Sequence, residues 1–104
     1  MKILLIDDNL MSSMRIENAL RSAGHNVKLA RKIAPEMADF DAVILNFGSR
    51  SMDGFTLLET AKTQLSNATF YGFCGHREVE IWRRAQENGA KMVSNERAMN
   101  GEIF

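Results

Sequence analysis

Short apolar runs alternate along this chain with stretches of helical periodicity, and this alternation constrains the fold more than any other feature. The first run, Ile3–Ile6, is continuous and has the length of a strand. Such a run is typical of a strand that is buried on both faces of a parallel sheet. Residues 16–23 then carry apolar side chains at the i, i+3, i+4, i+7 spacing of one helix face, and Gly24 follows as a stop.

The same alternation continues to the end of the sequence and predicts a single domain over residues 1–104. Strands are expected at 3–6, 26–30, 42–45, 69–74 and 91–94, with a helix between successive strands, one of them a short helix from Pro35 through Phe40. Strands that alternate with helices imply right-handed crossovers and a parallel sheet covered on both faces. We therefore expect an α/β fold, a flavodoxin-like doubly wound five-stranded parallel sheet with strand order 2-1-3-4-5, in which the last helix is truncated or missing.

Composition excludes several classes of protein. The 13 basic and 13 acidic residues cancel, so the chain lacks the surplus of Lys and Arg that a nucleic-acid-binding face requires. The single cysteine, Cys74, rules out an internal disulfide framework and favours a reducing cytoplasm. No stretch approaches the roughly 20 apolar residues that span a bilayer. We expect a cytoplasmic domain that binds neither nucleic acid nor membrane.

Polar side chains follow the first and third predicted strands at the point where each strand ends. Asp7 and Asp8 come directly after the first strand, and Asn46 ends the third. In a doubly wound sheet the ligand crevice lies at the carboxyl ends of the strands, where the winding direction reverses. In the order 2-1-3-4-5 that point lies between the first and third strands, so we expect Asn46 to face the acidic pair.

Three segments, "LLIDDN", "VILNFGSRSMDG" and "ENGAKMVSNE", resemble the receiver domains of two-component response regulators. The resemblance runs from Lys2 to about Glu96. It implies a domain in which two acids hold Mg²⁺ and an Asp at the end of the third strand accepts a phosphoryl group. It also implies a Ser or Thr at the end of the fourth strand and a Lys after the fifth.

This sequence keeps the two acids and departs from the family at the other three positions. The resemblance places Asn46 at the phosphoacceptor, Cys74 at the hydroxyl and Glu96 at the lysine. A carboxamide is not the carboxylate nucleophile that an acyl phosphate needs, and Glu96 carries the wrong sign of charge. We therefore expect a degenerate receiver, or pseudo-receiver, derived from a phosphorelay domain. It would be a protein-interaction module of a signalling pathway that works without phosphorylation, and not an enzyme.

A divalent cation is the one cofactor that the site residues suggest, although the predicted function requires none. If Mg²⁺ binds, its ligands are expected to be Asp7, Asp8, the side-chain oxygen of Asn46 and the carbonyl of Gly48. Binding is expected to be weak, because the site has lost one charged ligand. The alternative is that Asp7 and Asp8 form an inherited acidic strand end that holds no metal.

The end of the chain predicts an uncovered sheet face. After Glu96 only "RAMNGEIF" remains, enough for about two helical turns. We expect such a short helix to leave aromatic side chains of the fourth strand, Phe70 and Phe73, open on the two faces of the sheet. Exposed apolar patches usually mark interaction sites, so a homodimer or a dedicated partner is expected there, with Ile103 and Phe104 helping to cover it.

Two alternatives remain open at this point. The first is a phosphoacceptor switch that is still active and uses Asp53 or a loop serine. The second is a flavodoxin-type flavin-binding electron carrier, which shares the strand order but needs Gly, Ser and Thr donors after the first strand to hold a phosphate. Here Asp7 and Asp8 would repel one.

Overall fold

A computed structural model describes residues 1–37 and 39–104 of the chain and gives a five-stranded, fully parallel sheet in the order β2-β1-β3-β4-β5. The strands are β1 (Lys2–Ile6), β2 (Asn26–Ala30), β3 (Ala42–Asn46), β4 (Thr69–Cys74) and β5 (Lys91–Ser94). The helices are α1 (Leu10–Ser22), α2 (Gly54–Gln64), α3 (Val79–Glu87) and α4 (Asn95–Met99). The predicted flavodoxin-like order and the short last helix are confirmed.

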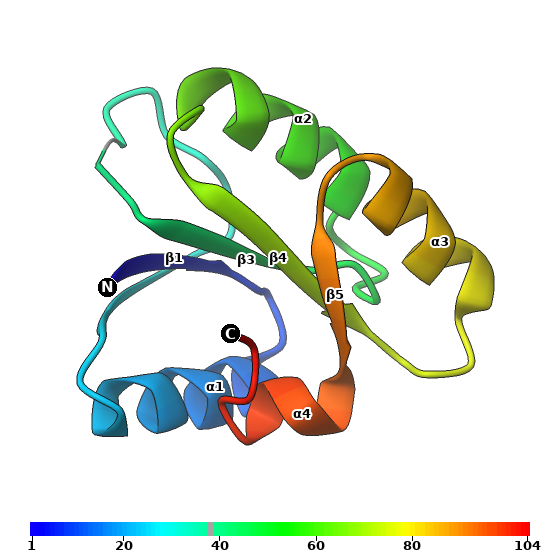
Figure 1. The fold of residues 1–104 in the computed structure, drawn as a ribbon, viewed down its shortest axis with the longest axis horizontal. Coiled ribbons are helices and arrows are strands. Elements are labelled where there is room, and N and C mark those ends of the chain that lie inside the picture. The colour runs from blue at the N-terminus through cyan, green and yellow to red at the C-terminus, as the bar shows by residue number, and fades with distance from the viewer. Residues whose placement is uncertain (38) are drawn as a thin grey trace.

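Helices cover both faces of the sheet, with α1 and α4 on one side and α2 and α3 on the other (Figure 1). Successive side chains of a strand point to opposite faces, so β1 contributes to two cores. Ile3 and Leu5 pack toward α1 and α4, whereas Leu4 and Ile6 belong to the cluster toward α2 and α3. All four are fully buried, which explains why the apolar run of β1 is continuous rather than alternating.

Helices α1 and α2 begin on side-chain caps in the loops that follow β1 and β3. The Asn9 carboxamide oxygen accepts hydrogen bonds from the backbone N–H groups of Met11 and Ser12, 3.0 and 3.3 Å away, and so starts α1. Asp53 starts α2 in the same way. Each cap fixes where its helix leaves the loop at the carboxyl edge of the sheet.

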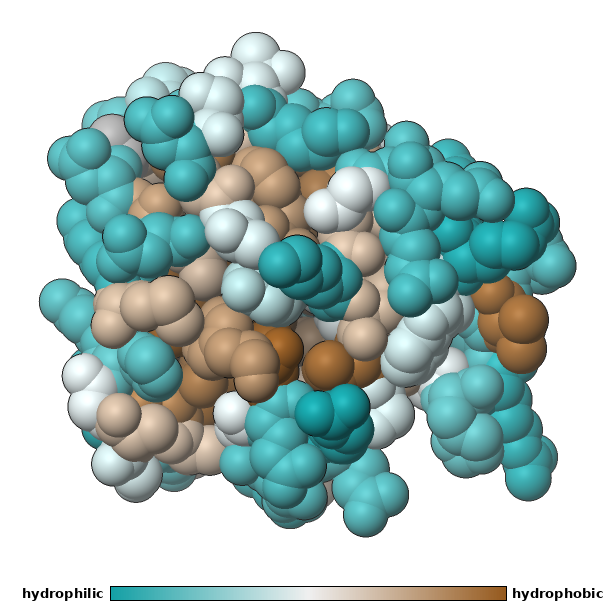
Figure 2. All heavy atoms as spheres, in the orientation of Figure 1, coloured by the Kyte–Doolittle hydropathy of each residue, from teal (hydrophilic) through white to brown (hydrophobic). Residues whose placement is uncertain are grey.

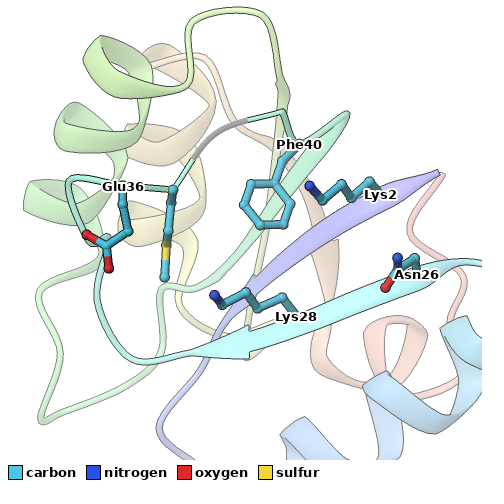
Figure 3. A pocket seen from close by; sticks show the side chains of 6 residues that line it. Lys2, Asn26, Lys28, Glu36 and Phe40 are labelled. Carbon is cyan, nitrogen blue, oxygen red and sulfur yellow. The ribbon is translucent and has the colours of Figure 1, made fainter.

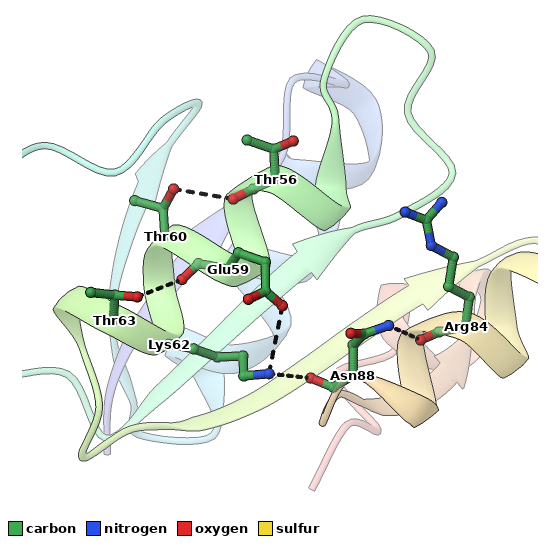
Figure 4. A network of polar contacts seen from close by, with 7 residues as sticks. All are labelled: Thr56, Glu59, Thr60, Lys62, Thr63, Arg84 and Asn88. Atoms are coloured by element: carbon green, nitrogen blue, oxygen red, sulfur yellow. Dashed lines mark hydrogen bonds and ion pairs between the residues drawn. The ribbon is translucent and has the colours of Figure 1, made fainter.

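Polar contacts lie between and beside helices α2 and α3 (Figure 4). The Lys62 ammonium of α2 donates to the carbonyl of Asn88 at the end of α3 over 3.0 Å and lies 3.6 Å from the Glu59 carboxylate. The Asn88 side chain donates back to the carbonyl of Arg84 over 2.8 Å. The hydrogen bond from Lys62 to Asn88 joins α2 to α3, and the other two contacts orient its partners.

The prediction of a helix from Pro35 through Phe40 is wrong, because the described residues of this segment form no helix. Residues 35 and 36 form a turn, Asp39 has a φ of 64°, and Ala38 lies outside the described residues. A non-glycine residue in the left-handed region interrupts a right-handed helix. The Gln64 side chain instead holds this segment by donating to the carbonyls of Ala34 and Met37. The connection from β2 to β3 therefore crosses the sheet without a helix in its described part.

The sheet face expected to be open is covered by the end of the chain itself, which corrects the predicted interaction surface. After α4, Ile103 turns back into the core and is 5% exposed, and Phe73 is 1% exposed. The Phe104 ring packs edge-on against Tyr71 at a centroid distance of 4.8 Å. Phe70 points to the other face and packs, half-buried, against the cluster beneath α2 and α3.

Some apolar surface remains around the two chain ends. Figure 2 shows apolar side chains gathered there in this view, and Met1 and Phe104 are each 49% exposed. Of the four residues predicted to form the interaction surface, Phe104 alone is largely exposed. The five residues after α4 thus cover this part of the sheet, because Ile103 fills the space that remains between α1 and the sheet.

Candidate functional site

Two adjoining hollows lie at the carboxyl edge of the sheet, where β1, β3 and β4 end. Their volumes are about 300 and 410 Å³. Both are lined by Asn9, Asn46, Gly48 and Arg50. Because they share these residues, we treat them as one cleft, which we call the strand-end cleft. Its further lining residues are Asp8, Ser12, Ser49, Ser51, Phe73, Gly75, Glu78, Asn95 and Met99.

Asn46 faces the acidic pair, as the sequence predicted, and it binds Asp7 directly. The Asn46 Nδ2 donates to Asp7 Oδ1 over 2.9 Å, while its Oδ1 accepts from the backbone N–H of Gly48 over 2.9 Å. Both side chains are enclosed, with Asp7 2% and Asn46 8% exposed. The last residue of β3 is therefore locked between a carboxylate and the following loop.

The buried carboxylate of Asp7 is satisfied by donors from α1 as well. Ser12 Oγ donates to Asp7 Oδ2 over 2.6 Å, and the backbone N–H of Asn9 donates to Oδ1 over 3.0 Å. A buried carboxylate is costly unless it is hydrogen-bonded, and three donors surround this one. The start of α1 thus completes the pocket of Asp7.

Asp8 turns outward from Asp7 and binds the loop that follows β3. One carboxylate oxygen accepts from Ser49 Oγ over 2.8 Å, and the other accepts from Ser51 Oγ. Ser49 Oγ in turn accepts from the backbone N–H groups of Ser51 and Met52. Asp8 therefore orders the Ser49–Ser51 turn.

The residues at the cleft fit a divalent cation only in part. Asp7, Asp8, Asn46 and Gly48 do converge at one strand edge, and carboxylate and amide oxygens suit Mg²⁺. However, a cation that used both acids would compete with the two serine hydroxyls for the oxygens of Asp8. Among residues 1–37 and 39–104, no three His, Cys, Asp or Glu side chains gather as a metal cluster.

Cys74 does not line the cleft, which corrects its place in the predicted site. Its side chain is fully buried in the cluster toward α2 and α3. The strand register explains this: Asn46 lies opposite Phe73, so those two share a face and Cys74 points to the other. Burial raises the pKa of the Cys74 thiol to about 11, and the Glu78 carboxylate adds to the shift.

Glu96 also stays out of the cleft, which corrects its place in the predicted site. Strand β5 ends at Ser94, whose Oγ accepts from the backbone N–H of Arg97 over 3.2 Å and caps α4. The helix begins at once, and Glu96 is exposed in its first turn. Asn95 and Met99 line the cleft instead. The negative charge of Glu96 therefore lies outside the cleft.

A different acid takes part in the cleft and was missed from the sequence. Glu78, in the loop after β4, accepts from the backbone N–H of Gly75 over 3.2 Å. Its carboxylate also approaches Gly48, where an added Cβ would lie 3.3 Å from Glu78 Oε2. Arg50 is the one Lys or Arg among the described lining residues. No signal in the sequence distinguished Glu78, because its position depends on how the loop folds back.

Asp53, the acid of the first alternative, lies outside the lining of the cleft. Its carboxylate accepts from Thr56 Oγ1 over 2.8 Å and from the backbone N–H groups of Phe55 and Thr56. The hydrogen bond from the Thr56 hydroxyl lowers the pKa of Asp53 below its ordinary value of 3.8. The side chain acts as a helix cap.

Comparison with known proteins identifies the fold. No family model and no curated protein matches the sequence. Among solved structures, the non-phosphorylated HemR receiver domain from Leptospira biflexa is 20% identical, with 94% of this chain and 93% of that chain covered and a TM-score of 0.73. A response regulator receiver domain protein from Clostridium thermocellum is 21% identical, with 97% and 92% covered and a TM-score of 0.76.

A third structure, full-length FixJ from B. japonicum, is 25% identical over 92% of this chain, with a TM-score of 0.75. The chain spans 52% of that protein. Together these structures show that the chain has the fold of response-regulator receiver domains. None of the helices in the described part of the chain is long and apolar enough to cross a membrane.

Proposed function

We propose that this chain is a receiver-fold signalling module of the two-component type that binds its protein partner without being phosphorylated. One observation carries the proposal: the Asn46 amide donates to Asp7 at the strand end where the resembling family places its phosphoacceptor. A carboxamide does not form an acyl phosphate. The hydrogen bond also gives Asn46 a structural role that an ionised Asp could not fill.

The surroundings of Asn46 support the loss of phosphoryl transfer. Stabilising a transferring phosphoryl group requires metal ions and cations around it. Asp8 is occupied by serine hydroxyls, and Arg50 is the one cation among the described lining residues. In this proposal the module keeps one conformation that phosphorylation does not change, and it has no enzymatic activity. Weak Mg²⁺ binding through Asp7 and Asp8 is compatible with it but not required. We place the module in the cytoplasm, where Cys74 stays reduced.

The partner surface that we propose lies at the start of α1, beside the strand-end cleft. Leu10, Met11 and Met14 are 66%, 81% and 52% exposed. They are neighbours on the first turns of the helix that Asn9 caps next to Asp7 and Asp8. Exposed apolar side chains that cluster in this way mark interaction sites, and methionine adapts to a partner surface.

A homodimer across β4 and β5, the arrangement expected from the sequence, has weaker support. Phe73 and Ile103 are buried within the chain, so neither is free to contact a second copy. The still-active switch is also not favoured, because Asp53 is engaged as a helix cap. The flavin carrier is not favoured either, because carboxylates follow β1 where a phosphate would need donors.

Phosphorylation independence is tested by intact mass measurement. The protein is incubated with acetyl phosphate and Mg²⁺, and no phosphoryl mass should be added. Asn46→Asp is measured in parallel, because it places a carboxylate that could accept a phosphoryl group at the end of β3. Asp53→Asn tests whether the Asp53 carboxylate accepts one. A single phosphoryl adduct on the wild-type chain that is lost in Asp53→Asn would establish the active switch instead.

Partner binding is tested by affinity capture with the wild-type chain, with and without acetyl phosphate. We expect the same protein to be captured in both conditions, and to be lost with Met11→Asp. Val79→Asp is the matched control, because Val79 is 65% exposed at the start of α3. Capture that requires acetyl phosphate, or that Met11→Asp leaves unchanged, would contradict the proposal.

A further inference from the structure

A second hollow lies on the sheet face where the connection from β2 to β3 has no helix in its described part. It has a volume of about 290 Å³. Lys2, Asn26 and Lys28 of β1 and β2 line one side, and Glu36, Met37 and Phe40 line the other. We call it the β1–β2 pocket. It is distinct from the strand-end cleft and shares no residue with it.

The pocket exists because the covering of this face is incomplete. Faces of parallel sheets are normally covered by helices and filled with apolar side chains. On this face Lys28 lies in register beside Leu4, and Leu4 beside Val43. Leu4 and Val43 are fully buried, whereas Lys28 is exposed. A row of apolar side chains thus ends in an ammonium group at the edge strand.

The two lysines put positive charge into the pocket, and neither forms an ion pair with Glu36, the carboxylate that also lines it. Among the described residues, neither Lys2 nor Lys28 has a carboxylate oxygen within 4.0 Å of its ammonium. Figure 3 shows both side chains extending along the sheet toward the segment that carries Glu36 and Phe40. An anion bound between the lysines would gain two charge-assisted contacts.

Phe40 gives the same pocket an aromatic wall. Its ring is held in the core and is 7% exposed, and the Lys2 ammonium lies 5.1 Å from the ring centroid. This cation–π contact keeps Lys2 over the ring rather than in open water. Met37 and the small accessible part of Phe40 give a flat ring of a ligand an apolar side to contact while its charged end reaches the lysines.

We propose that the β1–β2 pocket binds a small aromatic phosphate monoester of about the size of a nucleoside monophosphate. A phosphate monoester carries a charge of about −1.5 to −2 near pH 7, which matches two ammonium groups. The volume is at the lower end of the roughly 300–1,000 Å³ of small-molecule sites, so it suits one ring system and one phosphate. Glu36 at the rim opposes the anion and limits affinity.

The proposal is tested by NMR titration of the isotope-labelled 104-residue chain with AMP and GMP. Guanosine and inorganic phosphate serve as probes that carry only the ring system or only the anion. Either nucleotide should give saturable shifts at residues 2, 26–28, 36, 37 and 40 with a Kd of about 1 mM or below. Guanosine and phosphate should each bind several-fold more weakly than the matching nucleotide.

Three variants test which side chains contact the nucleotide, by whether each one weakens or strengthens nucleotide binding. Lys28→Gln and Lys2→Gln should each weaken nucleotide binding about threefold, and Glu36→Gln should strengthen it. Lys91→Gln should change nothing: Lys91 also lies over an aromatic ring, 5.8 Å from the centroid of Tyr71, but lines no part of this pocket.

Two results would overturn the proposal. One is the absence of saturable shifts with both nucleotides at about 10 mM, ten times the expected Kd. The other is binding whose shifts centre on Gly48 and Ser49, or that Lys28→Gln and Glu36→Gln leave unchanged. Neither result bears on Asn46 or on the surface of α1, so the outcome is independent of the proposed signalling function.

Discussion

The side-chain amide of Asn46 lies 2.9 Å from a carboxylate oxygen of Asp7, and both residues are buried at the end of neighbouring strands. An aspartate at position 46 would instead put two carboxylates in this place. Two close carboxylates disfavour each other's ionised form unless a cation lies between them. Asn46 therefore gives Asp7 a neutral hydrogen-bond donor in place of a like charge.

Changing Asn46 to Asp should make the stability of the protein depend on a divalent cation. In EDTA, Asn46→Asp should lower the free energy of unfolding by about 1–3 kcal/mol, because a donor to Asp7 is lost and a like charge is added. Adding Mg²⁺ should restore part of this loss. Thermal unfolding in EDTA and in Mg²⁺ measures both effects.

The control for this experiment is Asn67→Asp, at an exposed position in the loop before β4. It should behave like the wild type in either solution. If Asn46→Asp were as stable as the wild type in EDTA, the contact with Asp7 would not be the reason for an asparagine here.

Gly72 of β4 should not tolerate a side chain. An added Cβ would lie 2.3 and 2.4 Å from two ring carbons of Phe47 and 2.8 Å from the sulfur of Met92. Such overpacking costs about 1–3 kcal/mol, so Gly72→Ala should lower the denaturant midpoint without changing its slope. Gly75→Ala should be close to neutral, because the nearest atom to its Cβ is 3.6 Å away. Equal stability of the two variants would contradict the packing of Phe47 against β4.

The Cys74 thiol should be chemically inert in the folded protein. Its pKa is raised to about 11 from an ordinary 9.0, chiefly by burial, and the thiolate is the reactive form. At pH 8 alkylation by iodoacetamide should therefore proceed only after denaturant is added. Rapid alkylation of the native protein would place Cys74 at the surface.

The same shift gives the sign of a pH effect on stability. Between pH 9 and 11 the unfolded chain loses the thiol proton and the folded chain keeps it. Stability should therefore fall as the pH rises through this range. Cys74→Ala should remove this component of the alkaline loss, which chemical denaturation at pH 8 and at pH 10 can measure against the wild type.

The last two residues should contribute unequally to stability. Ile103 is buried between α1 and the sheet, so Ile103→Ala should cost about 2–4 kcal/mol. Phe104 is half-exposed, and Phe104→Ala should cost less.

Light scattering over a dilution series should show a monomer for the wild type. A stable dimer that Phe104→Ala dissociates would restore the homodimer expected from the sequence.

The strand order and the contact between Asn46 and the acidic pair could be predicted because they depend on periodicity and on where strands end. Ile3–Ile6 can be read as a strand buried on both faces without knowledge of its neighbours. Parallel strands bring their carboxyl ends to one edge, and the expected order places the first and third strands side by side, so Asp7 and Asn46 were expected to lie close together.

The orientation of side chains at those ends could not be predicted, because it depends on register. One residue of register decides whether Cys74 or Phe73 shares a face with Asn46. Glu96 was misplaced for a similar reason, since Ser94 caps α4 and starts the helix at once. Pro35 is typical of a helix start, but the positive φ of Asp39 shows that the loop follows a different path.

The two ends of the chain meet at His25, which sets how the domain can be joined to other polypeptides. The Met1 amine lies 3.0 Å from His25 Nδ1, and the Phe104 ring lies 5.5 Å from the imidazole. His25 immediately precedes β2, so this meeting point lies at the amino edge of the sheet, and the strand-end cleft lies at the opposite edge. A tag or fusion partner attached at either end would therefore leave from the side away from Asn46 and leave the cleft open to solvent.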